Sequence, residues 1–183
     1  MKTHPKLVLM NPEDLFAMPD GDKYELVNGI PVEKRMGAES GEITTLLSAL
    51  LTVFVREQRL GHVYDGQTGF QCFAEASLVR KPDISFVAVG RLPGDKSPKG
   101  NIKLAPDLAV EVVSPNDQYE EVEEKLNDYH AAGVKLVWIV SPASKTVQIR
   151  RADGTLALVR VDGQLFGETV IPGFSCKVAD LFV

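Results

Sequence analysis

Apolar and polar residues recur along this chain with the spacing of helices in some segments and of strands in others. Between Ser40 and Gly61 the apolar positions return every three or four residues, which predicts an amphipathic helix with Ser40 as its N-cap and Gly61 as its stop. A second, short helix is predicted after Asn11, because Asn is a favoured N-cap and Pro12 suits the first helical position.

Short apolar runs bounded by turn residues predict the strands. Asn28-Gly29 lies between two such runs and predicts a hairpin over residues 24–33. Further strands are predicted at residues 63–73, 83–89, 108–113 and 136–140. A helical pattern at residues 116–131 separates the last two, and this strand–helix–strand order predicts a parallel crossover. Alternating residues and turns at Asp153-Gly154 and Asp162-Gly163 predict C-terminal antiparallel strands. The predicted fold class is α/β (mixed α+β), a central mixed β-sheet flanked by helices.

Composition limits the class of protein. The 183 residues are 44% hydrophobic and 25% charged, which suits one globular domain over residues 1–183. The apolar stretches are too short or too amphipathic for a bilayer and the N-terminus lacks a signal-type apolar core, so we expect a cytoplasmic protein with no membrane partner. Cys72 and Cys176 have no paired spacing and are expected to be free thiols. A net charge of -5 argues against a protein coated in nucleic acid, so any such contact must be local.

Glu111 is the most informative residue, because it is a carboxylate within the apolar run 108–113. A buried carboxylate must be neutralised, paired or bound to a cation. Side-chain alternation places Glu111 on the strand face with the smaller residues. Asp83 opens the preceding predicted strand, and if the two strands pair, the shared negative charge of Asp83 and Glu111 favours a hard cation such as Mg²⁺. Asp107 lies roughly 13 Å from Glu111 along the strand, so we expect it at the start of the strand or in solvent.

Two more side chains have both a catalytic and a structural interpretation. Lys125 lies beside the apolar stripe of the helix predicted at 116–131, from where its ammonium could reach a metal-bound water and stabilise a charged transition state. It also follows Glu121 by four residues, and periodicity alone favours that surface ion pair. Glu42, in the first turn of the long helix, could be an outer metal ligand through water, or could simply complement the helix dipole. A metal-dependent hydrolytic site and an ordinary buried ion pair therefore both remain open.

Several motifs, spread over nearly the whole chain, together resemble the Uma family of restriction endonuclease-like proteins. In sequence order they are YELVNG from Tyr24, GEI from Gly41, RKPDI from Arg80, PDLAVEVVSP from Pro106, EKLNDY from Glu124 and AGVKLVW from Ala132. The resemblance implies the PD-(D/E)XK nuclease fold and metal-dependent hydrolysis of DNA phosphodiester bonds. It implies Mg²⁺ or Mn²⁺ as cofactor and DNA as partner, and cleavage of both strands of a duplex would favour a homodimer.

The resemblance also implies roles for individual residues. Asp83, Glu111 and the backbone carbonyl of Val112 would hold the metal. The usual lysine of the superfamily lies two residues after the Glu, where this chain has Val113, so the resemblance implies that Lys125 supplies the ammonium from the following helix. Glu42 matches an acidic catalytic position on the first helix of many superfamily members.

Residues 91–103 carry four basic side chains against one acidic side chain. Lys96, Lys99 and Lys103 are candidate contacts to substrate phosphates, and a solvated, turn-rich loop is an equally good interpretation. Three function classes result. The expected one is a Mg²⁺-dependent endonuclease. The others are a catalytically inactive nuclease-fold module that binds nucleic acid or protein, and a purely structural pairing of Glu111 with Lys125.

Overall fold

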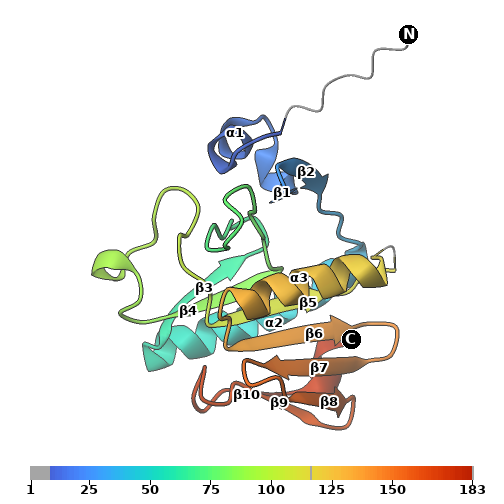
Figure 1. Ribbon diagram of the computed structural model, residues 1–183. Coiled ribbons are helices and arrows are strands. Elements are labelled where there is room, and N and C mark those ends of the chain that lie inside the picture. Colours follow the sequence, from blue (N-terminus) through green and yellow to red (C-terminus); the bar gives the residue numbers. More distant parts are fainter. Residues whose placement is uncertain (1–8, 116, 183) are drawn as a thin grey trace.

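A mixed six-stranded sheet forms the centre of the computed structural model, which describes residues 9–115 and 117–182 (Figure 1). Its strand order is β3-β4-β5-β6-β7-β8. The bounds are Gly61–Asp65 for β3, Ile84–Ala88 for β4, Leu108–Val112 for β5, Leu136–Ser141 for β6, Thr146–Arg151 for β7 and Leu156–Arg160 for β8. Only β5 and β6 are parallel, and α3 (Tyr119–Ala131) connects them, which confirms the predicted crossover. The predicted helix start at Asn116 lies outside the described residues.

Two small antiparallel sheets extend this centre. The predicted N-terminal hairpin is confirmed as β1 (Tyr24–Val27) and β2 (Ile30–Glu33), and the C-terminal pair consists of β9 (Gln164–Phe166) and β10 (Ser175–Lys177). Asn28 and Gly29 both have positive φ, as the tight turn between β1 and β2 requires. Three short 3-10 helices complete the elements: η1 (Gly21–Lys23), η2 (Pro93–Asp95) and η3 (Val178–Leu181).

Helices α2 (Ala38–Gln58) and α3 lie on opposite faces of the sheet (Figure 1). Strand β5 shows why, because its side chains alternate between two cores. Val110 packs in the larger core with Leu47 of α2, whereas Ala109 packs in the smaller core with Leu126 of α3. The predicted alternation is thereby confirmed, and it places Glu111 on the face that α3 covers.

Helix α2 begins earlier than predicted. Gly37 is its N-cap, and Ser40 lies in the first turn, where its buried hydroxyl is 3.2 Å from that of Ser114. The N-cap prediction for Ser40 was wrong because this hydroxyl makes a tertiary contact instead of satisfying a helix end. The helix ends at Arg59, a left-handed C-cap, two residues before Gly61. With 21 residues, α2 is long and apolar enough to cross a membrane by length and composition, yet one side of it packs in the larger core.

The strand predicted at residues 63–73 ends at Asp65. The Asp65 carboxylate accepts hydrogen bonds from the Gln67 N–H and the Thr68 hydroxyl, both at 3.2 Å, and these bonds turn the chain away from the sheet. Phe70 then returns as an isolated bridge partner of Arg80 and Ile102. A side-chain-stabilised turn inside an apolar run therefore ended the strand early.

The N-terminal segment covers one end of the sheet (Figure 1). The predicted short helix is confirmed as α1 (Pro12–Ala17), and Asn11 and Asp14 form a capping box at its start. Leu15, Leu26 and Val79 form a small apolar cluster, and the backbones of Leu26 and Val79 exchange two hydrogen bonds, of 2.8 and 3.0 Å. These contacts hold β1, and with it Glu25, against the segment that leads into β4.

Candidate active site

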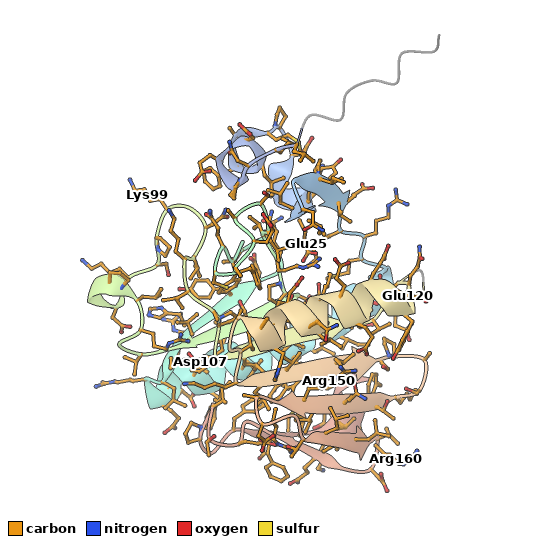
Figure 2. The ribbon with its side chains drawn as sticks, in the orientation of Figure 1. Glu25, Lys99, Asp107, Glu120, Arg150 and Arg160 are labelled. Atoms are coloured by element: carbon orange, nitrogen blue, oxygen red, sulfur yellow. The ribbon has the colours of Figure 1, made fainter. Side chains whose placement is uncertain are left out.

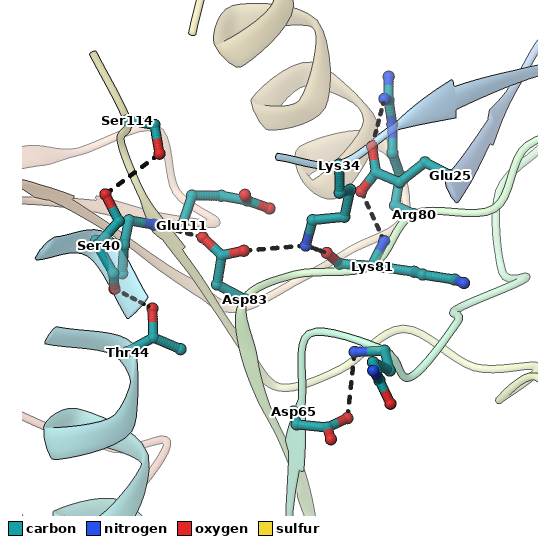
Figure 3. A network of polar contacts seen from close by, with 12 residues as sticks. Glu25, Lys34, Ser40, Thr44, Asp65, Arg80, Lys81, Asp83, Glu111 and Ser114 are labelled. Carbon is teal, nitrogen blue, oxygen red and sulfur yellow. Dashed lines mark hydrogen bonds and ion pairs between the residues drawn. The ribbon is translucent and has the colours of Figure 1, made fainter. Parts of the chain in front are cut away.

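Asp83 and Glu111 lie at the same end of two neighbouring strands. Strands β4 and β5 are antiparallel with Ile84 opposite Val110, so Asp83 comes one residue before this pair and Glu111 one residue after it. The Asp83 Oδ2 atom accepts a hydrogen bond of 2.8 Å from the N–H of Val112 (Figure 3). The sheet register thus brings together the two carboxylates that the sequence singled out.

Glu111 is held by two side chains of α3. The Tyr129 hydroxyl donates a hydrogen bond of 2.5 Å to Glu111 Oε1, and the Lys125 Nζ atom lies 3.5 Å from Glu111 Oε2. Burial raises the pKa of Glu111, and the nearby carboxylates of Asp83 and Glu25 also raise it, whereas Lys125 and Lys34 lower it.

Lys125 points inward, with its side chain 20% exposed. Its ammonium lies between two carboxylates, 3.5 Å from Glu111 and 3.4 Å from Glu25. Although burial opposes the charged form, these carboxylates raise the pKa of Lys125, which keeps the ammonium protonated. No ion pair between Lys125 and Glu121 is present among the described residues, so the surface pair that periodicity favoured is wrong.

Two residues of this site, Lys34 and Glu25, were not predicted from the sequence. Lys34 follows β2, and its Nζ atom donates a hydrogen bond of 2.9 Å to Asp83 Oδ1 and another to the carbonyl of Lys81 (Figure 3). No local pattern places Lys34 there. Glu25 did carry a signal, because it is a carboxylate inside an apolar strand, as Glu111 is.

Glu25 is almost fully buried beside the site. It accepts hydrogen bonds from the Lys81 N–H at 2.8 Å and from Arg80 at 3.2 Å. Burial by itself would raise the pKa of Glu25, but the cations of Lys125, Lys34 and Arg80 outweigh it and lower that pKa. Glu25 is therefore an ionised carboxylate that links Arg80 to Lys125.

Together these side chains form one compact group of alternating charges, which we call the carboxylate–lysine cluster. It consists of three carboxylates and three cations: Glu25, Asp83, Glu111, Lys34, Arg80 and Lys125. All six line a cavity of about 170 Å³, together with Val112 and Ser114. Both Asp83 and Glu111 therefore border the same cavity.

The other predicted site residues lie elsewhere. Glu42 is exposed on α2 and is not among the residues that line this cavity. Lys96, Lys99 and Lys103 are also exposed, and they line two different cavities, of about 740 and 490 Å³, beside the loop that follows β4. Figure 2 shows Lys99 on an outlying loop and Glu25 on the N-terminal hairpin.

Asp107 precedes β5, as predicted, but it is not a solvent residue. Its side chain is 1% exposed and forms ion pairs with Arg91 at 2.7 Å and with Lys135 at 2.8 Å. It also accepts a hydrogen bond of 2.8 Å from the N–H of Ala88. These two cations were not predictable from local patterns, because they come from two other segments of the chain. Figure 2 places Asp107 at the opposite end of the sheet from Glu120.

The oxygen atoms of Asp83, Glu111 and the Val112 carbonyl suit Mg²⁺ better than a metal whose ligands all come from protein side chains. Among the residues that the structure describes, no group of three or more His, Cys, Asp and Glu side chains could hold a metal ion. Mg²⁺ commonly takes one or two carboxylates and completes its shell with water, so Asp83 and Glu111 would suffice. The N–H and C=O of a residue in an antiparallel strand face the same neighbour, so the Val112 carbonyl faces the side on which Asp83 lies.

A mixed sheet with helices on both faces and two carboxylates at adjoining strand ends defines a nuclease-like fold of the restriction endonuclease class. A crystal structure of a putative nuclease of DUF820 from Anabaena variabilis matches it with a TM-score of 0.79 and 19% sequence identity, covering 94% of this chain and 97% of that chain. The Uma2 family, described as "Putative restriction endonuclease", matches residues 12–179, and the chain belongs to this family. None of the curated proteins matches the chain. The resemblance seen in the sequence is confirmed, and family and fold together support a nuclease.

Proposed function

We propose that this protein is a divalent-metal-dependent endonuclease that hydrolyses DNA phosphodiester bonds at the carboxylate–lysine cluster. One observation carries the proposal: the Lys125 ammonium lies 3.5 Å from Glu111. The chain has Val113 where the superfamily's lysine is expected, and Lys125 reaches the same carboxylate from α3. The site therefore has a cation next to its carboxylates although the usual sequence motif is incomplete.

Each residue of the proposed site has a distinct task. Asp83, Glu111 and the Val112 carbonyl would hold Mg²⁺ or Mn²⁺, which when bound supplies a Lewis acid toward water and phosphate. Lys125 would orient the attacking water and stabilise negative charge that develops on the phosphate. Tyr129 fixes the orientation of Glu111.

Other residues have a smaller place in the proposal. Lys96, Lys99 and Lys103 would contact phosphates away from the scissile bond, as exposed cations do on nucleic-acid-binding proteins. Cleavage of both strands of a duplex would favour a two-fold homodimer in the cytoplasm, because a dimer presents two sites. Glu42 has no task here, because its exposed side chain does not line the cavity of the cluster.

A cleavage assay tests the proposal. The purified protein is incubated with plasmid, linear duplex, single-stranded and branched DNA in Mg²⁺ or Mn²⁺, and products are separated on gels. We expect cleavage that disappears with a chelator and in Glu111→Gln. Glu120→Gln, which changes an exposed carboxylate on α3, is the matched control and should cleave like the unaltered protein. Equal cleavage by the Glu111→Gln variant would refute the proposed site.

A second function is favoured by one specific observation. The cluster already pairs its own charges, since three cations accompany three carboxylates. In a catalytically inactive module that binds nucleic acid or protein, this internal pairing would neutralise the buried charges without a metal ion. Absence of both metal binding and cleavage, together with metal-independent binding of DNA or of a protein, would favour this alternative.

A further inference from the structure

We propose that Lys34 is an internal counter-cation that occupies Asp83 in the metal-free protein and must leave it before a divalent cation binds there. This inference rests on the proposed function, because it concerns the same carboxylate. Lys34 comes from the N-terminal hairpin and has no part in the motifs that identify the family.

Both carboxylate oxygens of Asp83 accept a hydrogen bond. Its Oδ2 atom accepts from the Val112 N–H at 2.8 Å, and its Oδ1 atom accepts from Lys34 at 2.9 Å (Figure 3). The Asp83 side chain is 7% exposed and that of Lys34 is 17% exposed. An incoming cation that uses Oδ1 therefore meets the Lys34 ammonium at the position it would take.

Charge balance leads to the same conclusion. In the carboxylate–lysine cluster three cations already accompany three carboxylates, with Asp128 as a further partner of Arg80, so a divalent ion bound at Asp83 while Lys34 stayed would place two more positive charges beside the Lys34 ammonium in a largely buried site. Uncompensated buried charge is costly. Departure of Lys34 removes one positive charge from beside Asp83, and the phosphate of a bound substrate adds negative charge.

Lys34 is the cation best placed to leave. Lys125 is held by both Glu25 and Glu111, and Arg80 by Glu25 and Asp128. Within the described part of the chain, Lys34 has one ion pair, to Asp83, and it follows the last residue of β2, outside any helix or strand. Its ammonium can therefore turn toward solvent without breaking a strand pairing, at the loss of its hydrogen bonds to Asp83 and to the Lys81 carbonyl.

Calorimetric titration with Mn²⁺ tests the inference on the full chain without using enzymatic activity. We expect the Kd for Mn²⁺ to fall by about tenfold or more in Lys34→Met and in Lys34→Gln, which both remove the charge. Lys34→Gln can still donate a hydrogen bond to Asp83, so it covers the case in which Lys34→Met does not fold. Adding Asp83→Asn to either variant should abolish the gain and so locate the ion.

Lys23→Met is the matched control. Lys23 ends η1 next to the same hairpin, is exposed, and pairs with Asp20 rather than with the cluster. Its removal changes the net charge by the same amount and should leave the Kd within about twofold of the unaltered protein. A gain as large as that of Lys34→Met would attribute the effect to net charge and overturn the inference.

Thermal unfolding provides a second readout. Without metal, Lys34→Met should unfold at a lower temperature, because Asp83 loses its counter-cation, and Mn²⁺ should raise its unfolding temperature more than that of the unaltered protein. If the unaltered protein binds Mn²⁺ and both Lys34 variants bind it equally well, the inference is wrong while the proposed function stands. If none of them binds Mn²⁺ at millimolar concentrations, the metal-dependent function and the inference fail together.

Discussion

Tyr129 donates a hydrogen bond of 2.5 Å to Glu111, and both side chains are buried between α3 and the sheet. The two residues belong to one crossover unit, since α3 follows β5 and leads into parallel β6. The helix that completes this crossover also supplies Lys125. The orientation of the central carboxylate is therefore set by the packing of a single helix, and variants on α3 can test it.

Tyr129→Phe should lower the free energy of unfolding by about 1–3 kcal/mol, because a buried carboxylate oxygen loses its hydroxyl donor while the ring remains. Urea denaturation measures the change. Tyr64→Phe is the matched control, since the Tyr64 hydroxyl contacts Ser97 at an exposed position, 2.9 Å away. Equal losses in the free energy of unfolding for Tyr129→Phe and Tyr64→Phe would show that the buried hydrogen bond to Glu111 stabilises the fold no more than the exposed contact with Ser97 does.

Lys125→Met should destabilise the protein by about 2–4 kcal/mol and abolish DNA cleavage, because it leaves Glu111 and Glu25 without their shared ammonium. Combining it with Glu111→Gln should recover part of the lost stability but no cleavage, since one unpaired charge is then removed. Lys177→Met, at an exposed position, should change stability by less than about 0.5 kcal/mol. Full cleavage by the Lys125→Met protein would eliminate Lys125 from the mechanism.

Glu111 should make the metal-free fold less stable as the pH rises. Burial raises its pKa above the ordinary 4.5, so between 4.5 and the raised value the folded protein holds a proton that the unfolded chain has released. Stability is lost through this window as the pH increases. The stability of the unaltered protein relative to Glu111→Gln should fall accordingly in denaturation series at several pH values. A constant difference across this window would contradict the raised pKa.

Glu25 should show the opposite dependence. Burial opposes its charge, but Lys125, Lys34 and Arg80 lower its pKa below 4.5, so its ionised form favours folding. The stability it contributes is fully present above pH 4.5 and is lost as the pH falls through the lowered value. Glu25→Gln should therefore destabilise the protein most at neutral pH, by about 2–4 kcal/mol. Glu33→Gln, at an exposed position in the same hairpin, should have little effect at any pH.

Gly29→Ala should destabilise the hairpin that carries Glu25 and leads to Lys34. Gly29 has a φ of +78°, and an added Cβ would lie 2.9 Å from the Leu9 Cβ. Strain and contact together should cost about 1–2 kcal/mol in chemical denaturation. Gly154→Ala separates the two causes, because Gly154 has a similar φ of +83° but open space around its Cβ position. Equal losses of stability in Gly29→Ala and Gly154→Ala would show that the close contact with Leu9 does not contribute to the destabilisation.

Most secondary structure was predictable because it depends on short-range patterns. Asn11 marked the start of α1, Asn28-Gly29 marked the hairpin turn, and alternation placed Glu111 on the face that α3 covers. The early end of β3 was not predictable, since a hydrogen-bonded turn at Asp65 interrupts a run that reads as continuous. Local sequence patterns therefore predict strand bounds well, except where a side chain forms hydrogen bonds with the backbone that replace those of the strand.

The sequence by itself determined the order of the elements, the family, and the two strand carboxylates Asp83 and Glu111. Only the tertiary structure decided which charged side chains lie beside these two carboxylates. Lys125 points inward from α3, and Lys34 and Glu25 come from the N-terminal hairpin and the residue that follows it. The physical reason is that periodicity fixes which face of an element a residue occupies, whereas ion pairing depends on which segments the fold places against that face.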